Sequence, residues 1–352
     1  MIVSVSKPLS FASEEEDRVK CTYDHERELF RKIKPSMSYD GGDLPSWQKA
    51  AREKLRELLG MDRMIPAEPD LSVEWEKQRA GYTEMRFTFQ SEPGYRIPAH
   101  LLLPDGVKNP PVIICLQGHS PGMYISLGIV KQEKDELSIK NGNRDFCIRA
   151  VKEGYAAICM EQRSFGELKN PNKELDACLE PAMTALLMGR TTVGERVWDV
   201  SRMIDVVEKY FADKVDANSI CLTGNSGGGT ATAYAAALED RIKLAMPSCA
   251  VCTFRDSIGA MHHCSCNYVP QIGLFFDMGD LVAMACPKYY VQVNGAEDKI
   301  FPLAGAKECF EQGKRAYASL GFADRLTHVI GEEGHRFYAD KAWPAVHKYM
   351  GK

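Results

Sequence analysis

The sequence predicts an α/β protein with a doubly wound, mostly parallel β-sheet. From about residue 110 to the C-terminus, short apolar runs of strand length alternate with helical patterns. The runs at 112–116 and 156–160 are continuously apolar, as expected of central parallel strands covered on both faces. Before residue 105, alternating apolar and polar residues predict antiparallel strands at the start of the sheet.

Residues 1–70 predict a helical extension in front of the main domain, which is expected to span residues 71–352. A short helix is expected around Tyr23–Ile33. A second helix is expected over Trp47–Leu59, where apolar side chains recur on one stripe and Gly60 ends the helix. Since this stripe needs a partner, we expect the second helix to pack on the main domain.

The first strands of the main domain form a predicted hairpin. Glu84–Gln90 alternates as a half-buried edge strand does, and Tyr95–Leu103 follows the turn residues Pro93 and Gly94. Two long segments, at about 120–148 and 167–192, come after the ends of two buried strands. Because ligands bind at such strand ends, we interpret these segments as rim or lid-like insertions.

The remaining elements follow in regular order. Apolar residues between Val193 and Phe211 recur every three or four positions, which predicts one continuous amphipathic helix. Further strands and helices are predicted as follows: strands at 220–222, within 242–252, at 289–294 and at 325–330, and helices at 230–238, 304–320 and from residue 341.

Composition excludes several broad classes of protein. The chain has 352 residues and a net charge of −4, which argues against nucleic acid or a membrane surface as a partner. No apolar run reaches the length of a membrane span, and the first residues lack the pattern of a secretory signal. The 12 cysteines show no framework spacing, so we expect free thiols and a cytoplasmic location.

A G-x-S-x-G pattern, Gly224-Asn225-Ser226-Gly227-Gly228, lies between a buried strand and an Ala-rich helix. Strand, tight turn and helix are the context of a nucleophile elbow, in which the serine occupies a strained backbone conformation. Glycines two positions away on either side remove side chains that would clash there. The pattern therefore predicts Ser226 as a nucleophile; a glycine-rich turn is the simpler alternative.

A serine nucleophile needs a base and an acid that orients the base. Asp298 and His335 follow Ser226 in this order, each just after a predicted strand, so all three side chains should meet at one sheet edge. Glu297 is the rival acid. His262 and His263 are the rivals for the base.

Stabilisation of an oxyanion needs two preorganised N–H donors. The backbone N–H groups of Gly227 and His119 are the candidates, the second in the loop that follows strand 112–116. The His119 ring either lines the pocket or has a role of its own. Arg163, in the loop after the next strand, reads as a buried guanidinium that ties loops together, with substrate binding as the alternative.

Several cysteines and histidines are candidates for a metal site. The pair Cys249-x2-Cys252 has the spacing of half a zinc site, whereas Cys264-x-Cys266, beside His262 and His263, does not complete it. At an apolar strand end, cysteine also acts as a small hydrophobic residue. We therefore interpret these cysteines as structural or pocket-lining, and leave the role of the group open.

At these residues the chain resembles the α/β-hydrolase superfamily, over about residues 80–350. Within it, the chain is similar to bacterial acetyl xylan esterase-like and dienelactone hydrolase-like proteins. The motifs that carry the resemblance are Gln117-Gly118-His119, the loop EQRSFGE (161–167), Gly224–Gly228, Gly295–Asp298, Gly334-His335, the helix with Trp47, and HHCSCNYVP (262–270). Gln117 departs from the usual pattern, in which a histidine precedes the glycine.

The resemblance implies a Ser226–His335–Asp298 triad, an acyl-enzyme intermediate, and neither a metal nor an organic cofactor. It also implies a small-molecule or carbohydrate ester as substrate, with a short acyl group such as acetyl. A dienelactone hydrolase proper has a cysteine nucleophile, so Ser226 favours other esters. An acylaminoacyl-type peptidase and an inert binding protein are the alternatives. Acyl length, alcohol portion, any homo-oligomeric state and the lid paths stay open.

Overall fold

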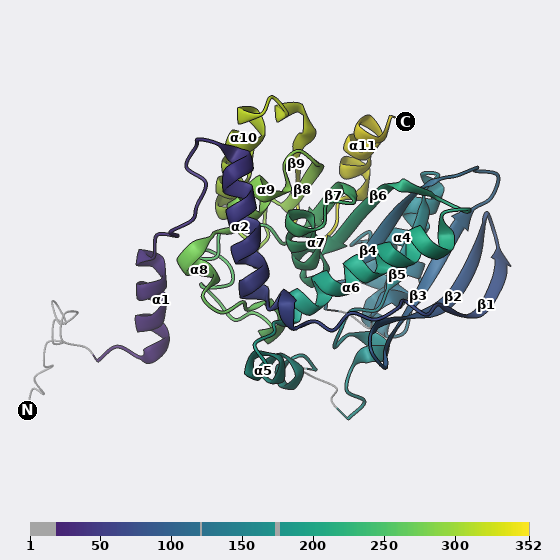
Figure 1. The fold of residues 1–352 in the computed structure, drawn as a ribbon, viewed down its shortest axis with the longest axis horizontal. Helices are drawn as coiled ribbons and strands as arrows, with labels where there is room; N and C mark the ends of the chain where they lie inside the picture. The colour runs from purple at the N-terminus through teal and green to yellow at the C-terminus, as the bar shows by residue number, and fades with distance from the viewer. Residues whose placement is uncertain (1–18, 120–121, 173–176, 352) are drawn as a thin grey trace, which may run out of the picture.

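A computed structural model describes residues 19–119, 122–172 and 177–351, and its centre is a nine-stranded mixed β-sheet (Figure 1). The strand order is β1-β2-β3-β5-β4-β6-β7-β8-β9. The pairs from β1 to β5 are antiparallel, and the pairs from β5 to β9 are parallel. The strands span Ser72–Arg79 (β1), Tyr82–Glu92 (β2), Tyr95–Pro104 (β3), Pro111–Leu116 (β4), Ala156–Met160 (β5), Asp216–Asn225 (β6), Ile242–Ser248 (β7), Tyr289–Gly295 (β8) and Leu326–Gly331 (β9). The predicted α/β fold with an antiparallel start is confirmed.

The prediction that Glu84–Gln90 forms an edge strand is wrong. This segment lies in β2, which pairs with β1 on one side and with β3 on the other, so β1 is the edge. The side chains of Phe87 and Phe89 are buried while Thr88 between them is partly exposed. Alternation reports which face of a strand is covered, and both an edge and an inner strand can show it.

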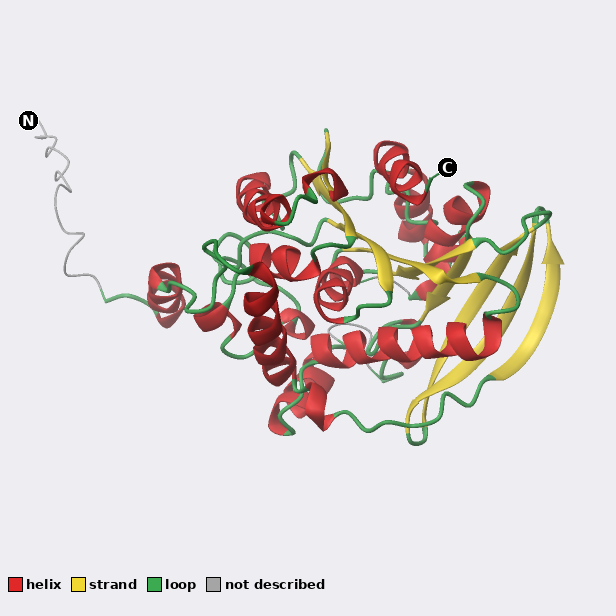
Figure 2. Cartoon of the chain, turned by 45° about the horizontal axis from the view of Figure 1, so that its top comes forward, coloured by secondary structure: helices red, strands yellow, loops and turns green. Residues whose placement is uncertain are grey.

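Helices cover both faces of the sheet (Figures 1 and 2). One face carries α6, α7, α9 and α10, with α2 packed outside them against α6, α7 and α9, and the other carries α4 and α11. Strand β4 shows the division, because Val112 and Ile114 join the first core and Ile113 joins the second. The helices span Thr22–Lys32 (α1), Leu44–Leu59 (α2), Glu133–Lys140 (α3), Phe146–Lys152 (α4), Leu179–Leu187 (α5), Thr192–Val206 (α6), Gly227–Leu238 (α7), Ile272–Phe275 (α8), Met278–Ala285 (α9), Leu303–Ser319 (α10) and Ala339–Met350 (α11).

The N-terminal helices lie against the main body. Helix α2 ends at Gly60, whose φ of 71° is the left-handed conformation that favours glycine. Gln48 Nε2 donates to the carbonyl oxygens of Ala283 and Cys286, at 2.9 and 2.8 Å. These bonds attach α2 to the end of α9. Whether residues 1–70 form a separate unit stays a prediction.

The predicted helix over Val193–Phe211 is interrupted near its end. Helix α6 stops at Val206, and a single π-helical turn, η4 (Val207–Phe211), continues it.

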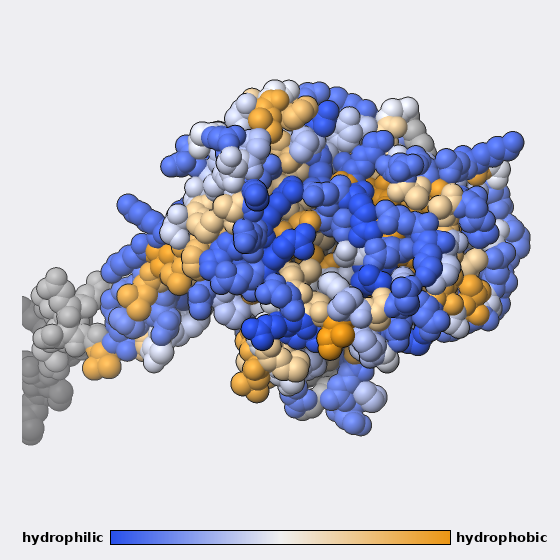
Figure 3. Space-filling view, viewed as in Figure 1, coloured by the Kyte–Doolittle hydropathy of each residue, from blue (hydrophilic) through white to orange (hydrophobic). Residues whose placement is uncertain are grey.

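The segment at about 167–192, before α6, contains α5. The outer side of α5 exposes apolar side chains as the orange surface below the centre of Figure 3 (Leu179, Met183, Leu187 and Met188). The lid-like role of this segment stays a prediction. In the described part of the chain, no helix has the length and apolar character needed to cross a membrane.

Candidate active site

Ser226 occupies the turn between β6 and α7, in a conformation that few side chains adopt. Its φ is 57° and its ψ is −126°. A Cβ atom at Gly224 would overlap the backbone of Gly228, and one at Gly228 would overlap the carbonyl of Leu116. The two glycines therefore let β4, β6 and α7 approach closely enough to hold this turn. The strained turn predicted from the G-x-S-x-G pattern is present.

The environment of Ser226 holds its turn in place and leaves its side chain accessible to a ligand. Its backbone N–H donates to Ser248 O at 2.9 Å, which attaches the turn to the end of β7. The side chain is only partly buried. The N–H groups in the first turn of α7, that of Gly227 among them, have no carbonyl partner within the helix. They therefore remain available at the position where an oxyanion would form.

Asp298 and His335 form a hydrogen-bonded pair at the ends of β8 and β9. His335 Nδ1 lies 2.8 Å from Asp298 Oδ2. The other carboxylate oxygen accepts the backbone N–H groups of Ile300 and Phe301, at 2.8 and 3.1 Å. Burial pushes the pKa of Asp298 upward, but the His335 ring and these two amides outweigh it, so the pKa lies below its ordinary value.

The rival residues lie elsewhere. Glu297 is exposed, whereas the carboxylate of Asp298 is fully buried. His262 is exposed. His263 is buried, with Nε2 3.2 Å from Ser257 Oγ, and burial lowers its pKa to about 4. The geometry therefore separates Asp298 and His335 from their alternatives.

The hydroxyl of Ser226 makes no hydrogen bond with His335 in the structure as described. Catalytic hydrogen bonds are often long without a ligand and shorten when substrate binds. Cys249, at the end of β7, lies beside the pair, because its sulfur, a carboxylate oxygen of Asp298 and a ring nitrogen of His335 are all within 4.8 Å of one another. Burial raises the pKa of this thiol to about 12, so it stays protonated.

The loop after β4 lies directly against the elbow. A Cβ atom on Gly118 would come within 2.8 Å of Ser226 Cβ, so only glycine fits at this position. The His119 ring lies over the start of α7, 3.2 Å from where a Cβ on Gly227 would be. The unusual Gln117 is buried and holds Arg144, donating to its carbonyl at 3.0 Å and accepting from its guanidinium at 3.2 Å.

Arg144 was not singled out from the sequence, yet its guanidinium reaches the elbow. Its Nη2 lies 3.3 Å from where a Cβ on Gly118 would be. Within residues 19–119, 122–172 and 177–351 no carboxylate forms an ion pair with it, and burial lowers its pKa to about 10. Together with His335 it lines a cavity of about 340 Å³. No motif marks this arginine, because it lies in an insertion whose path the sequence does not define.

The EQRSFGE loop has a structural role. Arg163 Nε donates to Asp199 Oδ2 and its Nη2 to Glu92 Oε2, at 2.8 and 2.9 Å, and all three side chains are buried. Glu161 accepts the backbone N–H groups of Met123 and Glu167 at 3.2 Å, and burial raises its pKa to about 7. The interpretation of Arg163 as a guanidinium that ties loops together is confirmed.

A second cavity, of about 520 Å³, opens beside the His119 ring. It is lined mainly by residues of the loops after β4 and β5 and of the segment before α5 (His119, Tyr124, Lys131, Gln132, Lys134, 164–167, Lys169, Ala177, Cys178 and Cys264). Its wall combines aromatic and charged side chains, three of them lysines. A wall that combines apolar surface with charged groups can take a sugar, whose ring has apolar faces and whose hydroxyl groups are polar.

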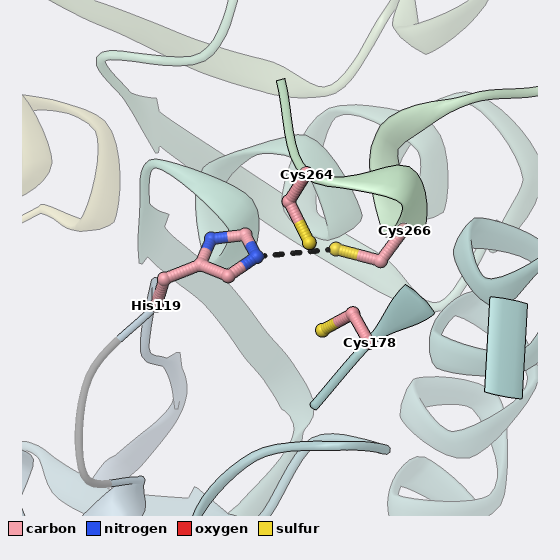
Figure 4. Close-up of side chains that lie close together, drawn as sticks. All are labelled: His119, Cys178, Cys264 and Cys266. Carbon is pink, nitrogen blue, oxygen red and sulfur yellow. Dashed lines mark hydrogen bonds between the residues drawn. The ribbon is translucent and has the colours of Figure 1, made fainter. Parts of the chain in front are cut away.

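Four side chains that could hold a metal meet at one end of this cavity (Figure 4). We call His119, Cys178, Cys264 and Cys266 the Cys3His cluster; their donor atoms all lie within 4.8 Å of one another. His119 Nε2 lies 3.3 Å from the sulfur of Cys266. The sequence places Cys264 and Cys266 beside His262 and His263, whereas the structure brings them to His119 and Cys178, which are distant in the chain.

Comparisons with known proteins point to one group of enzymes. A family model described as "Glucuronyl esterase, fungi" matches residues 189–252, which include the elbow. YtaP of Bacillus subtilis (strain 168), a candidate hydrolase, is 24% identical over 243 residues, covering 68% of this chain and 78% of that protein. The 4-O-methyl-glucuronoyl methylesterase 1 of Wolfiporia cocos (strain MD-104) is 24% identical over 181 residues, 44% of each chain.

Solved structures give the fold. A candidate acetyl xylan esterase from Bacteroides fragilis NCTC 9343 superposes with a TM-score of 0.74 at 18% identity, over 95% of this chain and 86% of that one. A glucuronoyl esterase from Solibacter usitatus superposes with a TM-score of 0.65 at 16% identity, over 91% of this chain and 97% of that one. The chain therefore has the α/β-hydrolase fold.

Proposed function

We propose that this chain is a serine hydrolase that cleaves carboxylic esters, with Ser226 as nucleophile, His335 as base and Asp298 as the group that orients the imidazole. The observation that carries the proposal is the 2.8 Å hydrogen bond between Asp298 and His335 at the sheet edge where the strained Ser226 turn also lies. This is the order and placement that the fold requires of a catalytic triad.

Each step of the reaction has a group to carry it out. His335 takes the proton of the Ser226 hydroxyl as its oxygen attacks the ester carbonyl, and the carbonyl π electrons move to the oxygen. The tetrahedral intermediate collapses, the bond to the alcohol breaks, and His335 gives its proton to the leaving alcohol. Water, deprotonated by the same ring, then attacks the acyl-enzyme and releases the acid and Ser226.

The negative oxygen of the intermediate needs donors already in place. The backbone N–H of Gly227, at the start of α7, and that of His119, in the loop beside Ser226, are the proposed pair. Arg144 adds a positive charge close to the same point, since its guanidinium adjoins Gly118. Because none of the described carboxylates neutralises Arg144, its field is available to the developing charge.

The proposed substrate is a carbohydrate or other small alcohol bearing a short acyl group such as acetyl. The 520 Å³ cavity beside His119 supports it, because aromatic and charged side chains both line its wall. The proteins of similar structure are named acetyl xylan and glucuronoyl esterases, which favours a sugar ester over a lipid ester. Esters of a uronic acid are therefore the second class to test.

The proposal also includes a cellular compartment. None of the 12 cysteines is in a disulfide, which supports a reducing compartment such as the cytoplasm. The two non-esterase alternatives, an acylaminoacyl-type peptidase and an inert hydrolase-fold binding protein, lack a supporting observation of this kind. An intact hydrogen-bonded Asp298–His335 pair is more than a binding role requires.

A direct test compares the unmodified chain with Ser226→Ala. We expect hydrolysis of a short-chain nitrophenyl ester and covalent labelling of Ser226 by a fluorophosphonate, both lost in the variant while its circular dichroism is unchanged. A panel of acetylated xylo-oligosaccharides, uronic acid methyl esters and acyl-peptide substrates then separates the classes. Turnover that survives Ser226→Ala would rule out this nucleophile, and turnover of the peptides alone would favour the peptidase.

A further inference from the structure

The Cys3His cluster gathers its members from three separate segments. His119 comes from the loop after β4, and Cys178 immediately precedes α5. Cys264 immediately precedes the short helical turn η5 (Ser265–Asn267), and Cys266 lies within it. Three of the four donors are thiols, and the fourth is an imidazole nitrogen that faces them (Figure 4). We infer that this cluster binds one zinc ion per chain in a four-coordinate structural site.

The distances suit that assignment. With zinc–sulfur bonds of about 2.3 Å, two ligand atoms of a tetrahedral site lie about 3.8 Å apart or slightly less. The four donor atoms are all within 4.8 Å of one another, and the pair formed by His119 Nε2 and the Cys266 sulfur is 3.3 Å apart. Small rotamer adjustments therefore bring the set to tetrahedral geometry. Three thiolates with one histidine are a common ligand set of structural zinc, and soft sulfur ligands favour zinc over magnesium or calcium.

The charge next to the cluster provides the second observation. Arg196 is buried, and its guanidinium donates to the sulfurs of Cys266 and Cys178 at 3.3 and 3.9 Å. Its other contacts are the carbonyl of Arg163, at 2.9 Å, and the ring of Phe165, at 4.2 Å. In the described ranges no carboxylate forms an ion pair with it. A buried positive charge of this kind requires a negative partner nearby.

A zinc site supplies that partner. Zinc carries two positive charges and three thiolates carry three negative ones, so the complex has a net charge of −1 beside the +1 of Arg196. Hydrogen bonds from a guanidinium to ligand sulfurs are also the outer contacts that hold metal ligands in place. Arg163 provides the contrast on the same side of the sheet, because it faces the carboxylates of Asp199 and Glu92.

Neutral packing of thiols explains the cluster less well. Cys147 lies against Cys115 and Cys159, and these three are buried in one apolar core. The Cys3His cluster instead adjoins a cavity, keeps Cys264 partly exposed, and faces a guanidinium. A disulfide between two of its cysteines would leave the charge of Arg196 without a partner.

The site has a consequence for the reaction, which rests on the proposed function. His119 directly follows Gly118, and its backbone N–H is a proposed oxyanion donor. A metal bound to its Nε2 would fix the ring over the start of α7. The ring also packs against Phe165, with 4.7 Å between the two ring centroids. The ion would thereby tie the oxyanion loop to η5 and to the start of α5, acting as a positioning device that does not touch the substrate.

The primary test needs no variant. The full chain, purified under reducing conditions from cells supplied with zinc, is expected to contain one zinc per chain by elemental analysis. After chelation, Co²⁺ should restore binding with the strong visible bands of a tetrahedral ion and a sulfur-to-cobalt charge-transfer band. No zinc uptake, or cobalt bound without that charge-transfer band, would overturn the site. A chain that is lighter by two hydrogens and binds no zinc would show a redox pair instead, and also overturn it.

Single substitutions test which side chains bind the zinc ion. We expect Cys264→Ser to weaken zinc binding by more than 100-fold, and Arg196→Met to weaken it by about 10- to 100-fold because it removes only outer contacts. Cys147→Ser, which removes a buried thiol from the apolar core, should bind zinc like the unmodified chain. Unchanged zinc affinity in Cys264→Ser would overturn the assignment, and circular dichroism checks that each variant folds.

Measurements of zinc content and of ester turnover test the zinc site and the proposed function separately. A chain that binds zinc through the cluster but hydrolyses no ester would contradict the proposed function and leave the site standing. A chain that hydrolyses esters but takes up no zinc would contradict the site alone. In an active, zinc-bound chain, chelation should lower kcat for the nitrophenyl ester more than it raises KM, because the oxyanion loop is freed.

Discussion

The imidazole of His335 is hydrogen-bonded to the carboxylate of Asp298, with Nδ1 2.8 Å from Oδ2, although the two residues are 37 positions apart in the chain. Parallel strands β8 and β9 bring them together, since each residue follows the C-terminal end of one of these neighbouring strands. The bond engages Nδ1, so Nε2 is the ring nitrogen that is not bound to Asp298. The bond therefore sets the tautomer of the His335 ring.

Replacing Asp298 by Asn should lower kcat by about 10,000-fold with little change in KM. The amide keeps the shape of the side chain but favours the wrong tautomer and no longer stabilises the charged imidazole. Steady-state kinetics on a nitrophenyl ester measure the effect. Glu297→Gln is the matched control, because it removes the exposed neighbouring carboxylate and should stay within about twofold of the unmodified chain. Equal losses in the two variants would contradict the assignment.

The same carboxylate predicts how stability depends on pH. The pKa of Asp298 in the folded chain lies below its ordinary value of 3.8, so folding favours the ionised form. Its contribution to the free energy of unfolding is therefore present above about pH 4 and is lost as the pH falls through the folded-state pKa. In Asp298→Asn this contribution is absent.

Urea unfolding at a series of pH values tests this. The difference in unfolding free energy between the unmodified chain and Asp298→Asn should be largest near neutral pH and shrink below about pH 4. Asp62→Asn, at an exposed position, should give a difference that does not follow this pattern. A difference that grows as the solution becomes more acidic would contradict the direction of the shift.

Gly228→Ala should damage both stability and activity. The added Cβ would overlap the carbonyl of Leu116, at the end of the strand that leads into the loop with Gly118 and His119. We expect a cost of about 3 kcal/mol or more in unfolding free energy, and a fall in kcat in the folded enzyme. Gly81→Ala is the control, since it adds only backbone strain in open space, worth about 1 kcal/mol.

Arg163→Met should be a stability variant. It leaves the buried carboxylates of Asp199 and Glu92 without their cation, which typically costs about 3–5 kcal/mol. KM should not change, because Arg163 contacts protein groups. Arg149→Met removes an arginine with more exposed partners and should cost less than about 1 kcal/mol. A rise in KM with unchanged stability would instead make Arg163 a substrate-binding residue.

The sequence predicted the parts of this site that are encoded locally. Strand, glycine turn and helix around Ser226 are neighbours in the chain, and the apolar runs that end near Asp298 and His335 mark strand ends by themselves. The strand order could not be read in this way. The alternation in β2 is compatible with an edge strand and with an inner strand, because periodicity does not tell which backbone groups are paired.

Contacts between loops that are distant in the chain could not be predicted from the sequence either. Cys178 and His119 approach Cys264 and Cys266 only because insertions fold back over the sheet edge, and no periodic pattern encodes such a path. The C-x2-C spacing of Cys249 and Cys252 suggested a different grouping. In the structure Cys249 adjoins Asp298 and His335 instead, so spacing along the chain pointed to the wrong partners.

Arg144 is expected to affect the electrostatics of the oxyanion. Its guanidinium adjoins Gly118, and in the described ranges it has no carboxylate partner, so it should stabilise negative charge that develops on the substrate oxygen. Arg144→Gln should therefore lower kcat by about 100-fold, with a smaller change in KM. Arg336→Gln provides the matched control. This arginine lines the same cavity but is bound to Glu333 and Asn143, so we expect only a small change in kcat. Equal effects in both variants would mean that the cavity responds to net charge alone, and a loss confined to KM would mean that Arg144 binds the ground state.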